Sequence, residues 1–339
     1  MQFRTIHGDN VATNYAQACG LILEVGQERE TRGGQVLTAP YPVLTITDKP
    51  WQRVLVSRRR DANPFFHLFE SIWMLAGQND GTWLDQFVSD FSSRYAEVDG
   101  TIHGAYGYRW RGQFVNAGDQ LKTVAERLKH SKSDRRAVIQ MWSAEDDLYS
   151  PTELDDETGL PFPEPRDIPC NTQVYVKVRD DGRLTTTVTC RSNDIVWGCY
   201  GANAVHFSVL HEWLAAAIGV PMGPMYQLSD DWHLYKSVMG KLDPYCPNIY
   251  ASNDMRHFPM FEDAMLGLED AEKFVAEGER GLYMNPFFDM VAVPMLRVHR
   301  LYKEGYYDEA YENLHRVLAR DWQLACRVWL DTRMEKKRG

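Results

Sequence analysis

The sequence predicts a protein of the α/β (α+β) class, in which helices and antiparallel strands share one chain. Residues 173–179 and 183–191 alternate apolar and polar side chains, as half-buried strands do. Asp180-Asp181-Gly182 joins them and is a strong hairpin-turn signal. The long apolar segment 202–219 follows and is expected to be a helix, because Gly219 and Pro221 would end it.

The first part of the chain predicts two helices and an apolar strand. Residues 12–30 carry apolar side chains at helical spacing, and residues 40–47 form the apolar run PYPVLTIT. Segment 63–77 is expected to be a helix, since Pro64 suits the first turn and Gly77 suits the stop.

Residues 119–136 predict a helix that runs into a basic turn before the strand 137–142. The acidic, proline-rich segment 143–167 is expected to be an exposed loop. From about residue 256 the chain becomes helical, charged and aromatic, without a chemical motif. We therefore predict a main domain of residues 1–250 and a helical C-terminal extension of residues 251–339.

Bulk composition narrows the class of protein. The net charge of −10 argues against direct binding to nucleic acid. No apolar run is long enough to span a bilayer, and the N-terminus lacks a signal-peptide layout, so we expect a cytoplasmic protein and no membrane partner. The six cysteines form no CxxC pair, which favours free thiols and no bound metal.

Cys170 stands out among these cysteines. It follows Pro169, precedes Asn171 and lies directly before the first strand of the predicted hairpin. Alone, this position suits a small core residue as well as it suits a nucleophile. Pairing of the hairpin strands would bring Cys170 and Arg191 to the same end of the sheet.

The segment after the hairpin concentrates polar residues. Arg191 and Ser192 end a strand, Asp194 follows, and Asn203 stands at a helix start. The plainer interpretation is a strand-to-helix connection with a capping Asn. Proximity to Cys170 favours a site instead.

Two further sites in this acidic chain carry arginines. Arg135 and Arg136 suit either a solvated helix end or a bidentate grip on a phosphate. Arg32 lies in the glycine turn TRGG. Each point alone is weak evidence for a phosphate site.

Three other segments offer groups for proton transfer or recognition. Glu70 lies in an apolar, aromatic helix, where it would be costly to bury unless it faces solvent. Tyr106 lies between glycines, where a phenol can approach a ligand and transfer a proton. On a strand, His233 and Tyr235 would share one face, which suits either a sugar hydroxyl or a simple pair of satisfied polar rings.

In chain order, these segments resemble the thymidylate synthase family over roughly residues 12–240. The resemblance implies a three-layer α/β fold around a large, mainly antiparallel sheet, and a symmetric homodimer. It rests on motifs that recur in the family's order: the TR-G turn, FE-x-x-W-x-L, G-x-Y-G-x-x-W-R, S-x-R-R, P-C, R-S-x-D…G…N and D-x-H-x-Y.

The resemblance implies a role for each matching residue. Cys170 would be the nucleophile that adds to C6 of a pyrimidine, with Glu70 and Tyr106 managing proton transfers. Asp194 would be both a catalytic and a folate-binding group, and Glu70 and Trp73 would also contact the folate. The implied nucleotide-binding residues are Arg32, Arg191, Ser192, Asn203 for the base, His233 and Tyr235 for the sugar, and Arg135 and Arg136 from the partner subunit.

The implied chemistry begins when the thiolate adds to C6 and turns C5 into a nucleophilic enolate. The enolate takes the one-carbon unit of 5,10-methylenetetrahydrofolate, and loss of the C5 proton leaves an exocyclic methylene. Hydride from the folate then gives a methyl product, whereas water gives hydroxymethyl. We expect the arginine cluster to bind the phosphate and to lower the pKa of the thiol.

Four departures from the family pattern bear on the product. Asn171 replaces the family's His after the Cys, and Cys190 replaces its Gln. A shielding Trp position falls on Ser92. Matching Asn203 needs one extra residue in the bend GCYGAN, since otherwise Ala202 takes the position. The chain also continues into helices, which supply either a substitute lid or dimer surface, where a synthase ends in a short apolar tail.

Loss of the shielding Trp and of the closing tail removes features that exclude water. The pattern therefore favours the hydroxymethylase branch, as in some bacteriophages. Asn203 favours dUMP, because Asn can donate to O4 and accept from N3–H of uracil, whereas an Asp suits cytosine. A dCMP or CMP hydroxymethylase and a true thymidylate synthase remain alternatives.

Two interpretations come from other classes of protein. A non-catalytic nucleotide-binding relic is disfavoured by the retention of Cys170, Glu70, Tyr106 and the arginines. A zinc deaminase would need P-C-x-x-C, and Cys170 lacks the second cysteine.

Overall fold

The computed structural model describes residues 4–114, 116, 118–149 and 164–338. Its strands form one sheet in the order β1-β4-β8-β7-β6-β5, and β3 also pairs with β8 and carries β2. The strands are β1 (Arg4–Gly8), β2 (Gln27–Thr31), β3 (Gly34–Thr38), β4 (Val43–Thr47), β5 (Val138–Gln140), β6 (Asn171–Val178), β7 (Leu184–Asp194) and β8 (Met222–Tyr235).

The sheet is mixed but mainly antiparallel, as predicted. Among the described strands only the pairs β1–β4 and β7–β8 are parallel. The parallel pair β7–β8 has a direct consequence for function, because the carboxyl ends of two parallel strands meet at the same edge of a sheet. Residue 194 at the end of β7 pairs with residue 233 near the end of β8.

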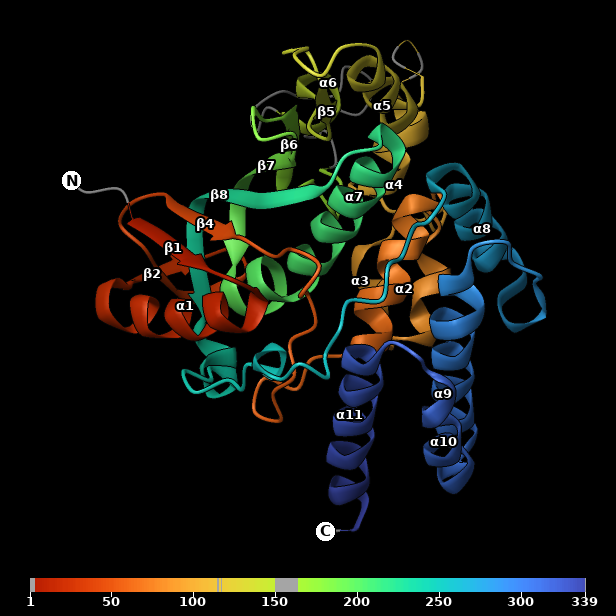
Figure 1. Ribbon diagram of the computed structural model, residues 1–339. Coiled ribbons are helices and arrows are strands. Elements are labelled where there is room, and N and C mark those ends of the chain that lie inside the picture. The colour runs from red at the N-terminus through yellow and green to blue at the C-terminus, as the bar shows by residue number, and fades with distance from the viewer. Residues whose placement is uncertain (1–3, 115, 117, 150–163, 339) are drawn as a thin grey trace.

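Helices cover one face of this sheet in two further layers (Figure 1). The α-helices are α1 (Val11–Val25), α2 (Pro64–Leu75), α3 (Phe91–Tyr95), α4 (Tyr106–Tyr108), α5 (Gln120–His130), α6 (Ala144–Asp147), α7 (Asn203–Ile218), α8 (Ala264–Glu277), α9 (Val293–Glu304), α10 (Tyr307–Asn313) and α11 (Arg320–Arg338). Shorter helical turns are η1 (Gly81–Gln86), η2 (Arg109–Gln113), η3 (Ile195–Ala202), η4 (Lys236–Lys241), η5 (Ile249–Ala251), η6 (Gly278–Arg280), η7 (Phe288–Ala292) and η8 (Leu314–Arg316).

Helix α7 is the central layer. It contacts β7 and β8 on one side and α2 on the other, and it is buried around almost its whole circumference. A helix that is apolar all round belongs in such a buried position. The sheet, α7 and α2 thus form the three layers that the sequence predicted.

The C-terminal helices α8, α9 and α11 pack against α2, and α8 also contacts α7. Phe65 of α2 meets the ring of Trp329 on α11 at 5.1 Å, and Phe69 stacks on Phe274 of α8 at 5.5 Å. One hydrophobic core runs from Val54 to Leu330 through these contacts. The division of the chain after residue 250 stays a prediction.

Most predicted elements are present with shifted ends. The helix predicted over 12–30 ends at Val25, because residues 27–31 pair with β3. The hairpin turn has Gly182 at φ +80°, a conformation that glycine adopts without strain. The prediction of a loop over 143–167 is wrong for its first residues, because Ser143 caps the short helix α6 there. Residues 150–163 of that segment lie outside the described residues.

Along the described part of the chain, no helix combines the length and the apolar character needed to cross a membrane.

Candidate active site

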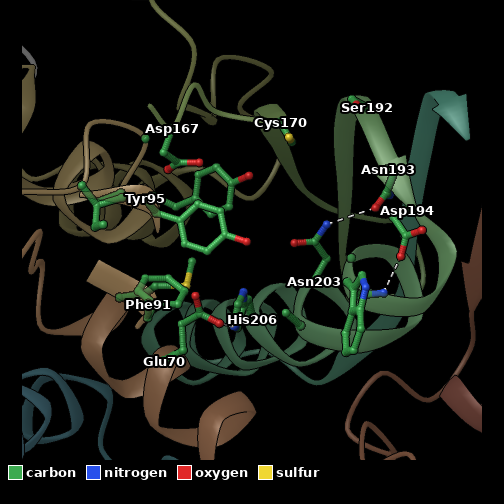
Figure 2. A pocket seen from close by; sticks show the side chains of 18 of the residues that line it. Glu70, Phe91, Tyr95, Asp167, Cys170, Ser192, Asn193, Asp194, Asn203 and His206 are labelled. Carbon is green, nitrogen blue, oxygen red and sulfur yellow. Dashed lines mark hydrogen bonds and ion pairs between the residues drawn. The ribbon is translucent and has the colours of Figure 1, made fainter. Parts of the chain in front are cut away.

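The ends of β7 and β8 open onto a cavity of about 360 Å³ that α2, α4 and α7 close from the other side. Cys170 lies at the same edge, because it directly precedes β6, which pairs antiparallel with β7. Nine of the residues predicted to form the site line this cavity: Glu70, Trp73, Tyr106, Cys170, Ser192, Asp194, Asn203, His233 and Tyr235. Figure 2 shows Cys170 and Asn203 facing the interior from different elements.

Cys170 is held by the backbone around it. The Arg191 backbone N–H donates to the carbonyl of Cys170 at 2.8 Å. The Arg191 guanidinium donates to the carbonyls of Pro169 at 2.9 Å and Ile168 at 3.0 Å. Cys170 is the only one of the six cysteines that is not buried. Arg191 therefore positions the approach to the thiol.

The arginine charge acts on the thiol pKa in the expected direction, but burial outweighs it, so the expected net lowering is wrong. Burial raises the pKa of Cys170 above its ordinary value, and the nearby charge of Arg191 opposes the shift without cancelling it. The guanidinium of Arg191 is directed to backbone carbonyls and to the face of Trp142, at 5.4 Å, rather than to the sulfur.

Tyr106 and Asn171 form a hydrogen-bonded pair beside Cys170. Helix α4 carries Tyr106 against α2, and Gly107 permits this close approach, since a Cβ there would lie 2.0 Å from the carbonyl oxygen of Met74. The Asn171 side chain donates to the Tyr106 hydroxyl at 2.9 Å and to Asn203 Oδ1 at 3.3 Å. Burial raises the pKa of Tyr106, so its hydroxyl keeps its proton.

Glu70 lies below this pair and does not face solvent. Its Oε2 atom is 2.9 Å from Nε2 of His206 on α7, in an ion-pair contact that is not aligned as a hydrogen bond. Figure 2 shows the carboxylate and the imidazole side by side in the cavity. The sequence analysis did not identify His206 as a site residue. Its position three residues after Asn203 was a usable signal, because residues at this spacing lie on the same face of a helix.

Asn203 is the first residue of α7 and is buried in the cavity wall. Its Nδ2 donates to Asn193 at 3.2 Å. The preceding turn η3 has π-helical winding and leaves helical geometry at Gly201. A π-helical turn holds one residue more than an α-helical turn. The winding therefore accommodates the extra residue that the match at Asn203 requires, and Ala202 also lines the cavity.

Asp194 is bound mainly to the backbone. Its Oδ1 accepts the N–H groups of Val196 and Trp197, and its Oδ2 accepts the N–H of Tyr235 at 3.2 Å. Burial nevertheless raises its pKa. The carboxylate thus joins β7, η3 and β8, and it lines the cavity at the same time.

His233 and Tyr235 point to one face of β8, as their spacing predicted. Their rings meet edge to face at 5.2 Å. Gly33 of the TRGG turn lies against Tyr235, because a Cβ there would be 2.7 Å from the phenol oxygen. This contact places the turn that carries Arg32 near the cavity.

The four predicted arginines do not line the cavity. Arg32 is 80% exposed and lies 3.3 Å from Glu164. Arg136 pairs with Asp134, and Arg135 is exposed on the same turn before β5. Arg191 is exposed at its rim.

Sequence reasoning missed several residues of the cavity. Asp167, three residues before Cys170, lines it, and burial together with the charge of Glu70 raises the pKa of Asp167 to about 6. The Ser92 side chain donates to Asp85, while its neighbours Phe91 and Tyr95 line the cavity. An aromatic wall is therefore present where the sequence suggested its loss.

This arrangement can perform covalent chemistry on a flat, polar ring. A thiol and an amide face one space, with a phenol and a carboxylate within the same walls. The aromatic residues Trp73, Phe91 and Tyr95 fit the pterin ring of a folate, which stacks on such surfaces. The described residues contain no cluster able to hold a metal ion. Fold and site are those of a one-carbon transferase.

The chain belongs to the thymidylate synthase family. The sequence profile of that family, described as thymidylate synthase, matches residues 13–263. A deoxyuridylate hydroxymethyltransferase of Pseudomonas phage M6 is 39% identical over 325 residues, which cover 91% of this chain and 88% of that protein. A second one, of Bacillus phage SP01, is 29% identical and covers 85% of this chain and 74% of its own length.

A putative thymidylate synthase of Methanothermobacter marburgensis is 29% identical over 232 residues. That match covers 91% of the archaeal protein but only 67% of this chain. The match to the Pseudomonas phage protein covers 91% of this chain, so it includes part of the C-terminal segment that the family profile leaves out. The phage relative therefore shares at least part of this extension.

Proposed function

We propose that the protein transfers a one-carbon unit from 5,10-methylenetetrahydrofolate to C5 of dUMP and completes the reaction with water, giving 5-hydroxymethyl-dUMP. The observation that carries the proposal is the polar pair of Glu70 and His206, 2.9 Å apart, in the cavity that contains Cys170. A reaction that ends with hydride must keep water away from the methylene, whereas a reaction that ends with water needs polar groups to hold it. The names of both phage relatives support the same activity.

The residues of the chain act in sequence. The Cys170 thiolate adds to C6 of the bound pyrimidine, and the folate supplies the one-carbon unit. The Tyr106 hydroxyl is protonated and fixed by Asn171, so it can exchange a proton with a water beside C5. His233 and Tyr235 would hold the sugar, and Arg32, Arg191 and Ser192 the phosphate. Asp194, Glu70 and Trp73 would contact the folate, with Asp194 also taking part in catalysis.

Asn203 supports uracil over cytosine. Its Nδ2 donates to Asn193 and its Oδ1 accepts from Asn171, so neighbouring groups fix which way the amide points. One N–H and one lone pair remain to bind O4 and N3–H of uracil. Cytosine presents the opposite pattern, because its 4-amino group donates and its N3 accepts.

The outer face of the sheet supports a homodimer. Cross-strand pairing aligns Ile46, Tyr226, Thr187, Tyr175 and Val138 in one row on the side away from α7. Tyr175 is 45% exposed there. A second copy packed on this face would cover the row and bring its Arg135 and Arg136, at the edge before β5, toward the phosphate.

The C-terminal extension supports α2 rather than closing the site. Among the described residues, none after Tyr235 lines the cavity. Since α2 carries both Glu70 and Trp73, we assign residues 251–339 a bracing role within the fold. The phage origin of the hydroxymethyltransferase relatives supports a place of action in the cytoplasm of a bacterial host.

Product analysis tests the proposal. Purified protein is incubated with methylenetetrahydrofolate and with dUMP, dCMP or CMP, and the products are identified by mass spectrometry. We expect hydroxymethyl-dUMP and recovery of tetrahydrofolate. A methyl product with stoichiometric dihydrofolate would show a thymidylate synthase, and a preference for dCMP would overturn the choice of base.

A folate-free measurement separates an enzyme from a nucleotide-binding relic. Reversible addition of Cys170 at C6 makes the C5 hydrogen exchangeable, so dUMP in D₂O should acquire deuterium at C5 with the wild-type protein. Cys170→Ala should abolish this exchange. A wild-type protein that binds dUMP without exchange would be the relic.

Mixing two inactive variants tests the donated arginines. Cys170→Ala and the double variant Arg135→Ala/Arg136→Ala would each lack a different part of the site. A heterodimer contains one site with Cys170 and intact partner arginines, so mixing should restore up to about a quarter of the wild-type sites. No recovery from a mixture that exchanges subunits would exclude donation across the interface.

A further inference from the structure

His206 is a buried imidazole without a settled partner. It is the fourth residue of α7, it is 4% exposed, and it lines the cavity. Neither ring nitrogen makes an aligned hydrogen bond within the described residues. Buried polar atoms are almost always hydrogen-bonded to protein or ordered water, so an imidazole left in this state next to a cavity indicates a bound small molecule.

Glu70 provides the second observation. Its Oε2 atom lies 2.9 Å from Nε2 of His206 and also lacks an aligned hydrogen bond. Three buried polar atoms without aligned partners, Oε2 of Glu70 and both nitrogens of His206, therefore meet at one wall of the cavity. A water needs two to four polar partners and room for its volume, and this place supplies both.

We propose that His206 is the positioning residue that decides how the reaction ends, because with Glu70 it holds the water that adds to the exocyclic methylene. This inference rests on the proposed hydroxymethylation and assigns its last step to a named pair. Two polar groups beside the pair are bonded within the protein: the Asn171 amide nitrogen donates to Tyr106, and Asp194 accepts from backbone amides. Among the described residues that line the cavity, Glu70 and His206 form a carboxylate–imidazole contact whose meeting atoms make no aligned hydrogen bond.

The step balances without a further reactant. Water oxygen forms a bond to the exocyclic CH₂ carbon, and the electron pair of that double bond moves into the C4 enolate. Glu70 accepts the proton released by the water, and His206 stabilises or shares it. Collapse of the enolate restores the C5=C6 double bond and expels Cys170 from C6 as a thiolate. No electrons are gained or lost overall.

Several titratable groups surround the pair. On α2, His67 lies one turn before Glu70, and burial holds its pKa well below the ordinary value, so His67 stays neutral. From the loop before β6, Asp167 and Cys170 face the same space, and from α4 Tyr106 does. Because the pKa of Asp167 is raised to about 6, that carboxyl gains a negative charge just below neutral pH.

Two substitutions separate the water step from earlier steps. His206→Phe keeps a flat ring but removes both polar atoms, whereas His206→Gln keeps a hydrogen-bonding group near the position of Nε2. With His206→Phe we expect hydroxymethyl product to fall by about 10²-fold, the lower end of what proton transfer contributes. In a single turnover, with enzyme in excess over nucleotide, release of tritium from [5-³H]dUMP should stay near the wild-type rate, because the methylene still forms.

The interrupted reaction should leave a signature on the protein. Without water addition, the methylene adduct stays bonded to Cys170, and intact-protein mass spectrometry should detect the added nucleotide. His206→Gln should recover part of the product, because its amide can still hydrogen-bond the water. Affinity for dUMP and folate-free C5 exchange should be unchanged in both variants, which also shows that they fold.

His211→Gln is the matched control, since His211 lies on the same helix, is fully buried and contacts Thr186 outside the cavity. It should leave the ratio of product to released tritium unaltered. In the single-turnover assay, equal loss of product and tritium release in His206→Phe, or no loss in either, would overturn the role of His206. A wild-type methyl product would instead refute the proposed function, so the two failures are distinguishable.

Discussion

The hydroxyl of Tyr106 accepts two hydrogen bonds from Asn171, one from its backbone N–H at 3.1 Å and one from its side-chain Nδ2 at 2.9 Å. A hydroxyl has two acceptor lone pairs and one proton to donate. With both lone pairs engaged, the phenol proton remains for a group in the cavity. Asn171, which departs from the family's Cys-His pattern, thus fixes the direction of a proton donor.

Removing this side chain should affect both stability and turnover. In Asn171→Ala, the Tyr106 hydroxyl loses a buried donor, which should lower the free energy of unfolding by about 1–3 kcal/mol. C5 exchange should slow by about tenfold or more, since the phenol is no longer fixed. Urea unfolding and deuterium exchange measure these effects. Lys177→Ala, an exposed change on the same strand, should alter stability by less than about 0.5 kcal/mol.

The raised pKa of Cys170 predicts the pH dependence of its reactivity. The thiolate is the reactive form, so the rate of alkylation by iodoacetamide should rise with pH through the alkaline range and be low at neutral pH without nucleotide. Arg191→Met removes the charge that opposes the shift and should move the profile to still higher pH. Peptide mass spectrometry can follow Cys170 selectively, because the other cysteines are buried. A profile centred below the pKa of a free thiol would contradict this account.

Asn203→Asp should change the preferred base. A carboxylate accepts from the 4-amino group of cytosine but cannot donate to O4 of uracil. We expect the ratio of kcat/KM for dCMP to that for dUMP to rise by about 10²-fold, the effect of leaving polar groups unpaired in a binding site. Competition between the two nucleotides in one reaction measures it. An unchanged ratio would mean that another residue reads the base.

Trp329→Ala should destabilise the fold through α2. Trp329 is 7% exposed and contacts Phe65 of α2, Tyr302 at 4.9 Å and the guanidinium of Arg333 at 4.0 Å. Loss of a buried Trp costs about 3–5 kcal/mol. The midpoint of thermal unfolding should fall while KM for dUMP stays constant below it. Leu318→Ala, at a side chain 52% exposed, is the control and should change little.

Individual elements show which parts of the fold and the site could be predicted from the sequence. Alternation and the Asp-Gly turn determine β6 and β7, and apolar continuity determines α7, because these signals depend on neighbours along the chain. The nine cavity residues were found through motif order, without knowledge of any contact. The prediction of a lowered thiol pKa for Cys170 was wrong, because burial raises that pKa and burial depends on segments distant in the sequence. The aromatic wall was missed at Phe91 and Tyr95, because the direction of a side chain on a short helix depends on what it packs against.

By itself, the sequence determined the class of the protein and the mainly antiparallel sheet, and it singled out Cys170 as the predicted nucleophile, because each follows from local pattern or a short motif. The tertiary structure alone decided that His206 meets Glu70, that Asn171 fixes Tyr106, and that the C-terminal helices brace α2. These relationships join residues from separate elements. Their distances depend on the packing of α2, α4 and α7 against one edge of the sheet, which no local pattern encodes.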